Sequence, residues 1–254
     1  MAKRWSINED IVLYLYCVKN PRAYADDNHV KRMVAIIEEL GYGYRSHSAI
    51  LQRSYFYELL LERRQISNVP RQIITVYNTL SRESAQWIQS VKSNIQEFYN
   101  PHSSLEIHDS NLFLENLQDN NTDLLGYKHT INFQSTFPMI LQKYIDLKKI
   151  KKHKDMCAEI GMKPDTFGSI LRGRYNDVKK DNVLRICVGL HLSVSEADEL
   201  LNSAGFVLSN AIMTDVVIKA FLQARHYSVV AINAELYENN APMLFNTDNI
   251  PIEE

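Results

Sequence analysis

The sequence is poor in the residues that interrupt helices, with only eight glycines and seven prolines among 254 residues. This scarcity favours a helical protein, because both residues are unfavourable inside helices. No run of 18 or more apolar residues is present, which argues against a membrane-spanning helix. The first ten residues, MAKRWSINED, lack the apolar core of a secretory signal peptide. We therefore expect an all-α, cytoplasmic protein that makes no membrane contact.

Residues that carry catalytic or metal chemistry are also sparse. The three cysteines, Cys17, Cys157 and Cys187, have no CxxC spacing, and each lies in an apolar helical context. We interpret them as reduced core residues. The sequence has no glycine-rich phosphate loop, no GxSxG and no paired histidines with metal-ligand spacing. These absences argue against an enzyme and against a cofactor or a bound metal.

The most informative stretch is 154–174, KDMCAEIGMKPDTFGSILRGR, which has the pattern of a helix, a tight turn and a second helix. Gly161 stands where the turn needs a positive φ. Pro164 suits the first turn of the second helix, where its missing N–H costs nothing. Ala158 is small enough to let the two helices pack closely. The apolar residues expected between the helices are Cys157, Ile160, Met162, Phe167 and Ile170. The residues expected to point outward are Lys163, Asp165, Thr166, Ser169, Arg172 and Arg174.

This pattern resembles the Cro/repressor-type (XRE-like) helix-turn-helix family, in which the second helix enters the DNA major groove. Residues 183–206, VLRICVGLHLSVSEADELLNSAGF, are similar to the later helices of that fold, with Ser193 or Ser195 as a helix cap. Asp165 departs from the family pattern because an acid repels phosphate, and Gly168 is unusual within a recognition helix. The resemblance implies base-edge contacts by Lys163, Asp165, Thr166 and Ser169. It implies phosphate contacts by Arg172, Arg174, Tyr175 and Lys179.

Charge is concentrated around this motif. The whole chain has a net charge of −2, but residues 143–185 hold 12 of the 28 basic and 6 of the 30 acidic residues, a local net charge of +6. A basic patch on a mildly acidic protein is typical of nucleic-acid binding. The run of Lys148, Lys149, Lys151, Lys152 and Lys154 supplies much of it. Either these lysines contact phosphate, or they form the solvated face of a helix.

A second helical domain is predicted over residues 1–66. Ser6 with Glu9 forms a capping box, which marks a helix start. Further helices are expected over about 28–40 and from Ser46 onward. The segments RWSINEDIVLYLYCVKNP and RSHSAILQRSYFYELL are similar to a three-helix domain that precedes the nuclease in some bacterial HNH endonucleases, although the nuclease residues are missing. If the third helix reads DNA, the exposed candidates are Arg45, Ser46, His47, Ser48, Gln52 and Arg53. Alternatively, this domain is a dimerisation or docking bundle whose arginines are merely solvated.

The remaining segments connect and extend these two domains. Residues 67–132 are expected to be a helical connector, with helices over 70–99, followed by a polar linker. Residues 133–246 are expected to hold the helix-turn-helix domain and extra C-terminal helices, the first of them capped by Ser209 or Asn210. Residues 186–254 have a local net charge of −7, so this part should face away from DNA.

The sequence thus predicts two small helix-turn-helix-like domains joined by helices and a polar linker. We expect a sequence-specific protein that binds double-stranded DNA, a transcriptional regulator such as a repressor from a prokaryote or phage, and a homodimer. The alternative is a component of a bacterial defence or stress system that uses the helix-turn-helix fold to dock a protein partner.

Overall fold

A computed structural model describes residues 4–82, 85–99, 133–174 and 178–246 of the chain. These residues form twelve α-helices and one short 3-10 helix, and no strand occurs among them. The all-α fold class is therefore confirmed. None of the helices in these ranges is both long and apolar enough to cross a membrane.

The first three helices form a unit whose ends follow local capping rules. Ser6 and Glu9 make the expected capping box, because the Ser6 hydroxyl accepts the Glu9 N–H while the Glu9 carboxylate accepts the Ser6 N–H at 2.8 Å. Asp26 and Ser46 cap the next two helices through their side chains. The elements are α1 (Ile7–Lys19), η1 (Ala23–Ala25), α2 (Asp27–Glu39) and α3 (His47–Leu61).

Two helices follow in the region expected to connect the domains, α4 (Arg71–Arg82) and α5 (Ala85–Phe98). Helix α4 packs against α1, α3 and α14 (Val229–Glu238), whereas α5 packs along α13 (Met213–Gln223). The connector helices therefore join the core of the N-terminal helices to that of α13 and α14. The polar linker expected after α5 lies outside the described residues.

Five helices make the second group, of which the last four are short: α8 (Phe133–Leu147), α9 (His153–Glu159), α10 (Pro164–Leu171), α11 (Lys180–Gly189) and α12 (Val194–Ser203). Ser193 is the cap of α12, one of the two serines expected there, and it forms a second capping box with Glu196. The cap expected for α13 is wrong, because Ile212 occupies that position without a side-chain bond. Asp215, in the first turn of α13, instead accepts the Ser209 N–H at 2.8 Å.

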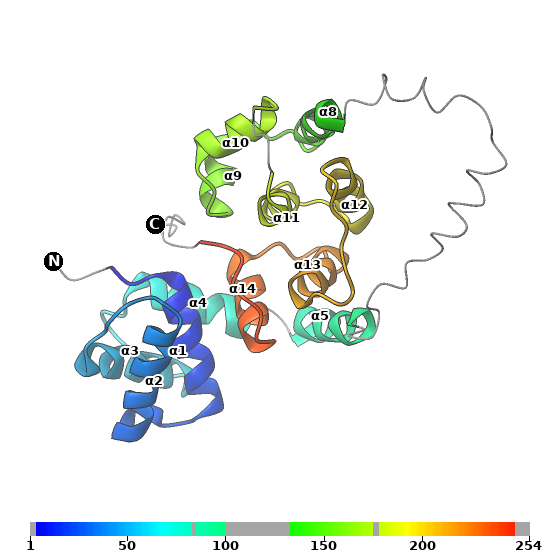
Figure 1. Cartoon of the computed structure of the whole chain (residues 1–254). Coiled ribbons are helices and arrows are strands. Elements are labelled where there is room, and N and C mark those ends of the chain that lie inside the picture. Colours follow the sequence, from blue (N-terminus) through cyan, green and yellow to red (C-terminus); the bar gives the residue numbers. More distant parts are fainter. Residues whose placement is uncertain (1–3, 83–84, 100–132, 175–177, 247–254) are drawn as a thin grey trace, which may run out of the picture.

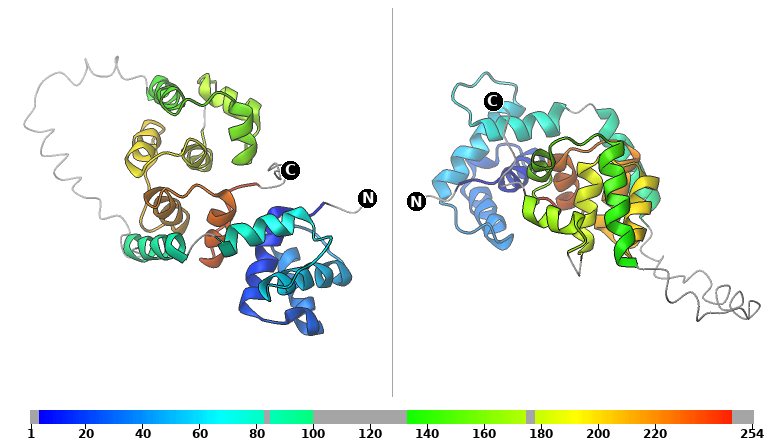
Figure 2. Two further views of the ribbon diagram at one scale, coloured as in Figure 1. Left: turned by 180° about the vertical axis from the view of Figure 1, so that it is seen from behind. Right: turned by 90° about the horizontal axis from the view of Figure 1, so that it is seen from above.

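The two groups of helices lie at opposite ends of the molecule, with α13 and α14 between them (Figure 1). The view from behind shows the same arrangement, with residues 4–61 in blue at one end and α8–α10 in green at the other (Figure 2). Buried apolar side chains from all these helices belong to one continuous core.

A buried amide cluster ties α1 to α14 and to the segment that follows α14. The Asn233 amide nitrogen donates to Asn8 Oδ1 and to the Phe245 carbonyl, both at 2.9 Å. The Asn8 amide nitrogen donates to the same carbonyl at 3.1 Å, and the Phe245 N–H donates to Asn233 Oδ1 at 3.1 Å. Each buried amide thus has partners, so the cluster fixes this junction without orphaned polar atoms.

All three cysteines are buried thiols, as expected. Burial raises the pKa of Cys157 to about 11 and the pKa values of Cys17 and Cys187 further. The thiolate is the reactive form, so these side chains behave as apolar core groups.

Candidate nucleic-acid interface

Helices α9 and α10 are joined by a tight turn, in the order of helix, turn and helix that the sequence predicts over 154–174. Its five predicted apolar residues, Cys157, Ile160, Met162, Phe167 and Ile170, are all buried. Gly161 has φ +63° in the turn, and Pro164 is the first residue of α10.

One close contact between helices of this group involves a glycine of α11. Ala158 is only partly buried. Gly189 in α11 instead faces α9, where an added Cβ would lie 2.8 Å from Ile160 Cγ2 and 3.0 Å from Met156 Cγ. Helices α9 and α11 therefore pack closely at Gly189, and the role expected for Ala158 at the α9–α10 crossing stays a prediction.

Helix α10 lies at the surface and packs mainly against α9 and α8. Lys163, Asp165, Arg172 and Arg174 are exposed, while Thr166 and Ser169 are partly buried. Lys179 is exposed at the start of α11. Tyr175 lies outside the described residues. The polar residues of α10 thus share its outer surface, and its apolar residues face the core.

Gly168 gives Arg172 room to lie flat on α10. A Cβ on Gly168 would stand 3.1 Å from one terminal guanidinium nitrogen of Arg172 and 3.2 Å from the other. The side chain of Arg172 therefore folds back over the preceding turn rather than extending into solvent. This contact gives a physical reason for the unusual glycine in this helix.

We expect Gly168→Ala to stabilise the protein by up to about 1 kcal/mol, because alanine favours the helix by that amount and the guanidinium can move aside. Urea unfolding of both proteins measures this difference. A loss of stability would mean that Arg172 is held in place more firmly than its flexible side chain suggests.

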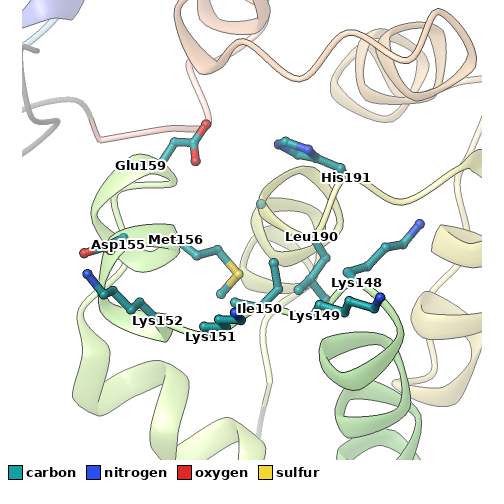
Figure 3. Close-up of a pocket in the computed structure, with 11 residues that line it drawn as sticks. Lys148, Lys149, Ile150, Lys151, Lys152, Asp155, Met156, Glu159, Leu190 and His191 are labelled. Carbon is teal, nitrogen blue, oxygen red and sulfur yellow. The ribbon is translucent and has the colours of Figure 1, made fainter.

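The lysine run is not a helix face. Helix α8 ends at Leu147 and α9 begins at His153, so Lys148, Lys149, Lys151 and Lys152 lie in the intervening connection, where Lys149 has φ +56°. They line an open cleft of about 570 Å³ against the end of α11, with Met156 between its walls (Figure 3).

Only part of this cleft carries uncompensated positive charge. Lys148 donates to Glu196 at 2.8 Å. Lys149, Lys151 and Lys152 are exposed and form no ion pair with any described residue. The same is true of Lys154 on α9. Two carboxylates, Asp155 and Glu159, line the same cleft (Figure 3). The ammonium groups without an ion pair among the described residues are therefore those of Lys149, Lys151, Lys152 and Lys154.

The structure corrects two of the N-terminal candidates, because Arg45 is buried and Arg53 is partly buried, and neither is exposed. Arg45 binds Glu9 through two bonds of 2.6 and 2.9 Å, and Arg53 binds both carboxylate oxygens of Asp10 at 2.6 Å. Both guanidinium groups also lie over the ring of Trp5, at 4.5 and 4.4 Å from its centroid. These arginines hold α3 to α1, so they are unavailable to DNA.

The other N-terminal candidates remain at the surface. His47 lies 2.8 Å from a carboxylate oxygen of Asp27, and Ser48 shares a hydrogen bond with the cap residue Ser46. Gln52 is exposed. Because Arg45 and Arg53 are paired with carboxylates of α1, the exposed surface at the start of α3 presents few cationic side chains to DNA.

The sequence interpretation missed His191 and Glu159, which share the lysine cleft. No spacing rule joins them to residues 148–152, because only tertiary packing of α11 brings His191 there. Among the described residues, no three His, Cys, Asp or Glu side chains are grouped closely enough to hold a metal ion. No protein-family model, curated protein or solved structure matches this chain.

Proposed function

We propose that the protein binds double-stranded DNA sequence-specifically through α9 and α10 and acts as a prokaryotic or phage transcriptional regulator. The observation that carries the proposal is the division of residues in α10. Phe167 and Ile170 pack inward, while the outer surface carries polar and basic side chains and lies at the edge of the molecule.

Base contacts would come from the start of α10. Lys163 can donate to guanine, Asp165 can accept from the cytosine amino group, and Thr166 and Ser169 can bond either kind of edge. Asp165 is thus compatible with a groove position if it faces cytosine. Phosphate contacts would come from Lys151, Lys152, Lys154, Arg172 and Arg174.

A homodimer on an inverted repeat follows from the same proposal, because a single recognition helix reads only a short half-site. Selection of bound sequences from a random duplex pool would reveal two half-sites about one helical turn apart for a dimer. A single short site would support a monomer.

The double variant Lys151→Gln/Lys152→Gln tests the phosphate contacts. Each phosphate that a protein neutralises contributes about 0.9 to the slope of log K against log salt, so this variant should reduce the slope by about 1.8. Fluorescence anisotropy with a labelled duplex at several salt concentrations measures the slope. Stability should not change, because both side chains are exposed and lack partners among the described residues.

Lys92→Gln is the matched control, because Lys92 is an exposed lysine on α5, away from α9 and α10, and lies 3.6 Å from Glu238. Its salt slope should equal that of the unmodified protein. Equal slopes for the double variant and the control would contradict phosphate contact by Lys151 and Lys152. Absence of any salt-sensitive binding by the unmodified protein would contradict the proposed function as a whole.

A protein-docking role is the second candidate, and one observation favours it. Met139 and Leu147 on α8 are 69% and 60% exposed, and α8 packs beside α10. Large exposed apolar side chains on one helix are typical of a contact surface for another protein. Met139→Lys would abolish such docking while leaving the salt-dependent DNA affinity unchanged.

A further inference from the structure

A second cleft, of about 410 Å³, lies between the N-terminal helices, α11 and the end of α14. Its walls come from the ends of α1 and α2, from α11, from α14 and from the segment after α14. A volume of this size is within the ordinary range of small-molecule sites. The cleft is separate from the lysine-lined cleft, and no residue lines both.

The side chain that distinguishes this cleft is Arg185 of α11. Its Nε atom is buried and has no hydrogen-bond partner among the residues that the structure describes. None of the carboxylates in the described ranges lies within ion-pair distance of its guanidinium, in contrast to Arg45 and Arg53, which are both paired with acids. Burial lowers the pKa of Arg185, and Asp181 offsets this only in part.

An orphaned guanidinium donor at the wall of a cavity needs a partner, since most buried donors in proteins have one. Guanidinium groups match carboxylate and phosphate oxygens, which they bind through parallel N–H bonds. We propose that this cleft binds a small organic anion, a carboxylate or a phosphate carried on an apolar body, with Arg185 as its counter-charge.

The rest of the lining supports an amphipathic ligand. Leu40, Pro242 and Met243 supply apolar walls. The phenol of Tyr237 lines the same space. A purely inorganic anion would leave the apolar walls unfilled, and a neutral apolar molecule would leave Arg185 without a partner.

Arg185 stands one helical turn before Gly189, the residue of α11 on which Ile160 and Met156 of α9 pack. A ligand held between Arg185 and the N-terminal helices would therefore join α1 and α2 to the helix that supports α9. Ligand binding itself is independent of whether the protein binds DNA, so either proposal can fail alone.

Titration with two anionic probes, benzoate and phenyl phosphate, tests the site. Isothermal titration or NMR shift changes should show saturable binding of at least one probe, and comparison of the two separates a carboxylate site from a phosphate site. Benzyl alcohol and inorganic phosphate, which lack the charge and the apolar body respectively, should bind more weakly. Arg185→Gln should weaken the preferred probe about tenfold or more, because a charge-assisted pair is lost.

Arg225→Gln is the matched control, because Arg225 is exposed, is also an arginine of the C-terminal half and does not line the cleft. Ala241→Phe gives a second variant that fills the cleft and leaves Arg185 intact, and it should also block the probe. Equal affinity in Arg185→Gln and in the control would overturn the proposal, as would the lack of saturable binding by either anionic probe.

Discussion

Arg53→Met is expected to destabilise the protein by about 3–5 kcal/mol, because it leaves the carboxylate of Asp10 buried without its counter-charge. The Asp10 side chain is fully buried, and Arg53 contacts both of its oxygens at 2.6 Å. The amide of Gln72 donates to the same carboxylate at 2.6 Å and cannot replace a positive charge. Chemical denaturation at pH 7 measures the loss.

Arg64→Met is the control for this change. Arg64 is 65% exposed and lies 3.8 Å from Glu62, so its removal should cost no more than about 1 kcal/mol. Similar losses in the two variants would show that the Asp10–Arg53 pair contributes no more than a surface contact.

The pH dependence of the Arg53→Met variant has a definite sign. Burial already raises the pKa of Asp10 in the folded protein, and the bonds with Arg53 and Gln72 offset only part of that rise. Without Arg53 this offset shrinks, so the pKa of Asp10 is raised further and the folded variant holds the proton more tightly than the folded unmodified protein does. The free energy of unfolding relative to the unmodified protein should therefore improve as pH falls and worsen as pH rises.

Gly161→Ala is expected to cost about 2–5 kcal/mol, for two reasons. A positive φ is unfavourable for any residue with a Cβ, by about 1–2 kcal/mol. In addition, the new Cβ would lie 2.0 Å from the Asn246 carbonyl oxygen, so backbone must move, and such overpacking costs about 1–3 kcal/mol. Thermal unfolding of the purified variant measures the sum.

Gly205→Ala separates the two contributions. Gly205 has φ +79°, and an added Cβ there meets nothing within 4 Å. Only the conformational cost should appear in this control. If both variants lose the same stability, the close approach of residue 246 to the helix-turn-helix turn contributes nothing in solution.

Local features of the fold were predictable from the sequence, because their signals lie within a few residues. The capping box of Ser6 with Glu9 joins residues three positions apart and forms as predicted, and Ser193 caps α12 as one of the two serines expected there. The apolar spacing across 157–170 likewise predicts which side chains of the helix-turn-helix are buried.

The wrong expectations concern long-range partners. Arg45 and Arg53 are residue types that commonly contact DNA, and so they were expected to be exposed. Their carboxylate partners, however, lie 36 and 43 residues earlier in the chain. Periodicity cannot distinguish an arginine that faces solvent from one that meets a buried acid on another helix. The same limit applies to the lysine cleft, whose far wall is the end of α11.

The amide cluster of Asn8, Asn233 and Phe245 has a consequence for synthesis on the ribosome. Asn8 and Phe245 are 237 positions apart, so α1 leaves the exit tunnel long before the residues that complete its packing. The apolar face of α1 that later meets α14 must wait for nearly the whole chain to emerge, and such distant contacts form late and slowly. The face of α1 that meets α14 therefore stays uncovered on the nascent chain until the residues up to Phe245 have left the tunnel.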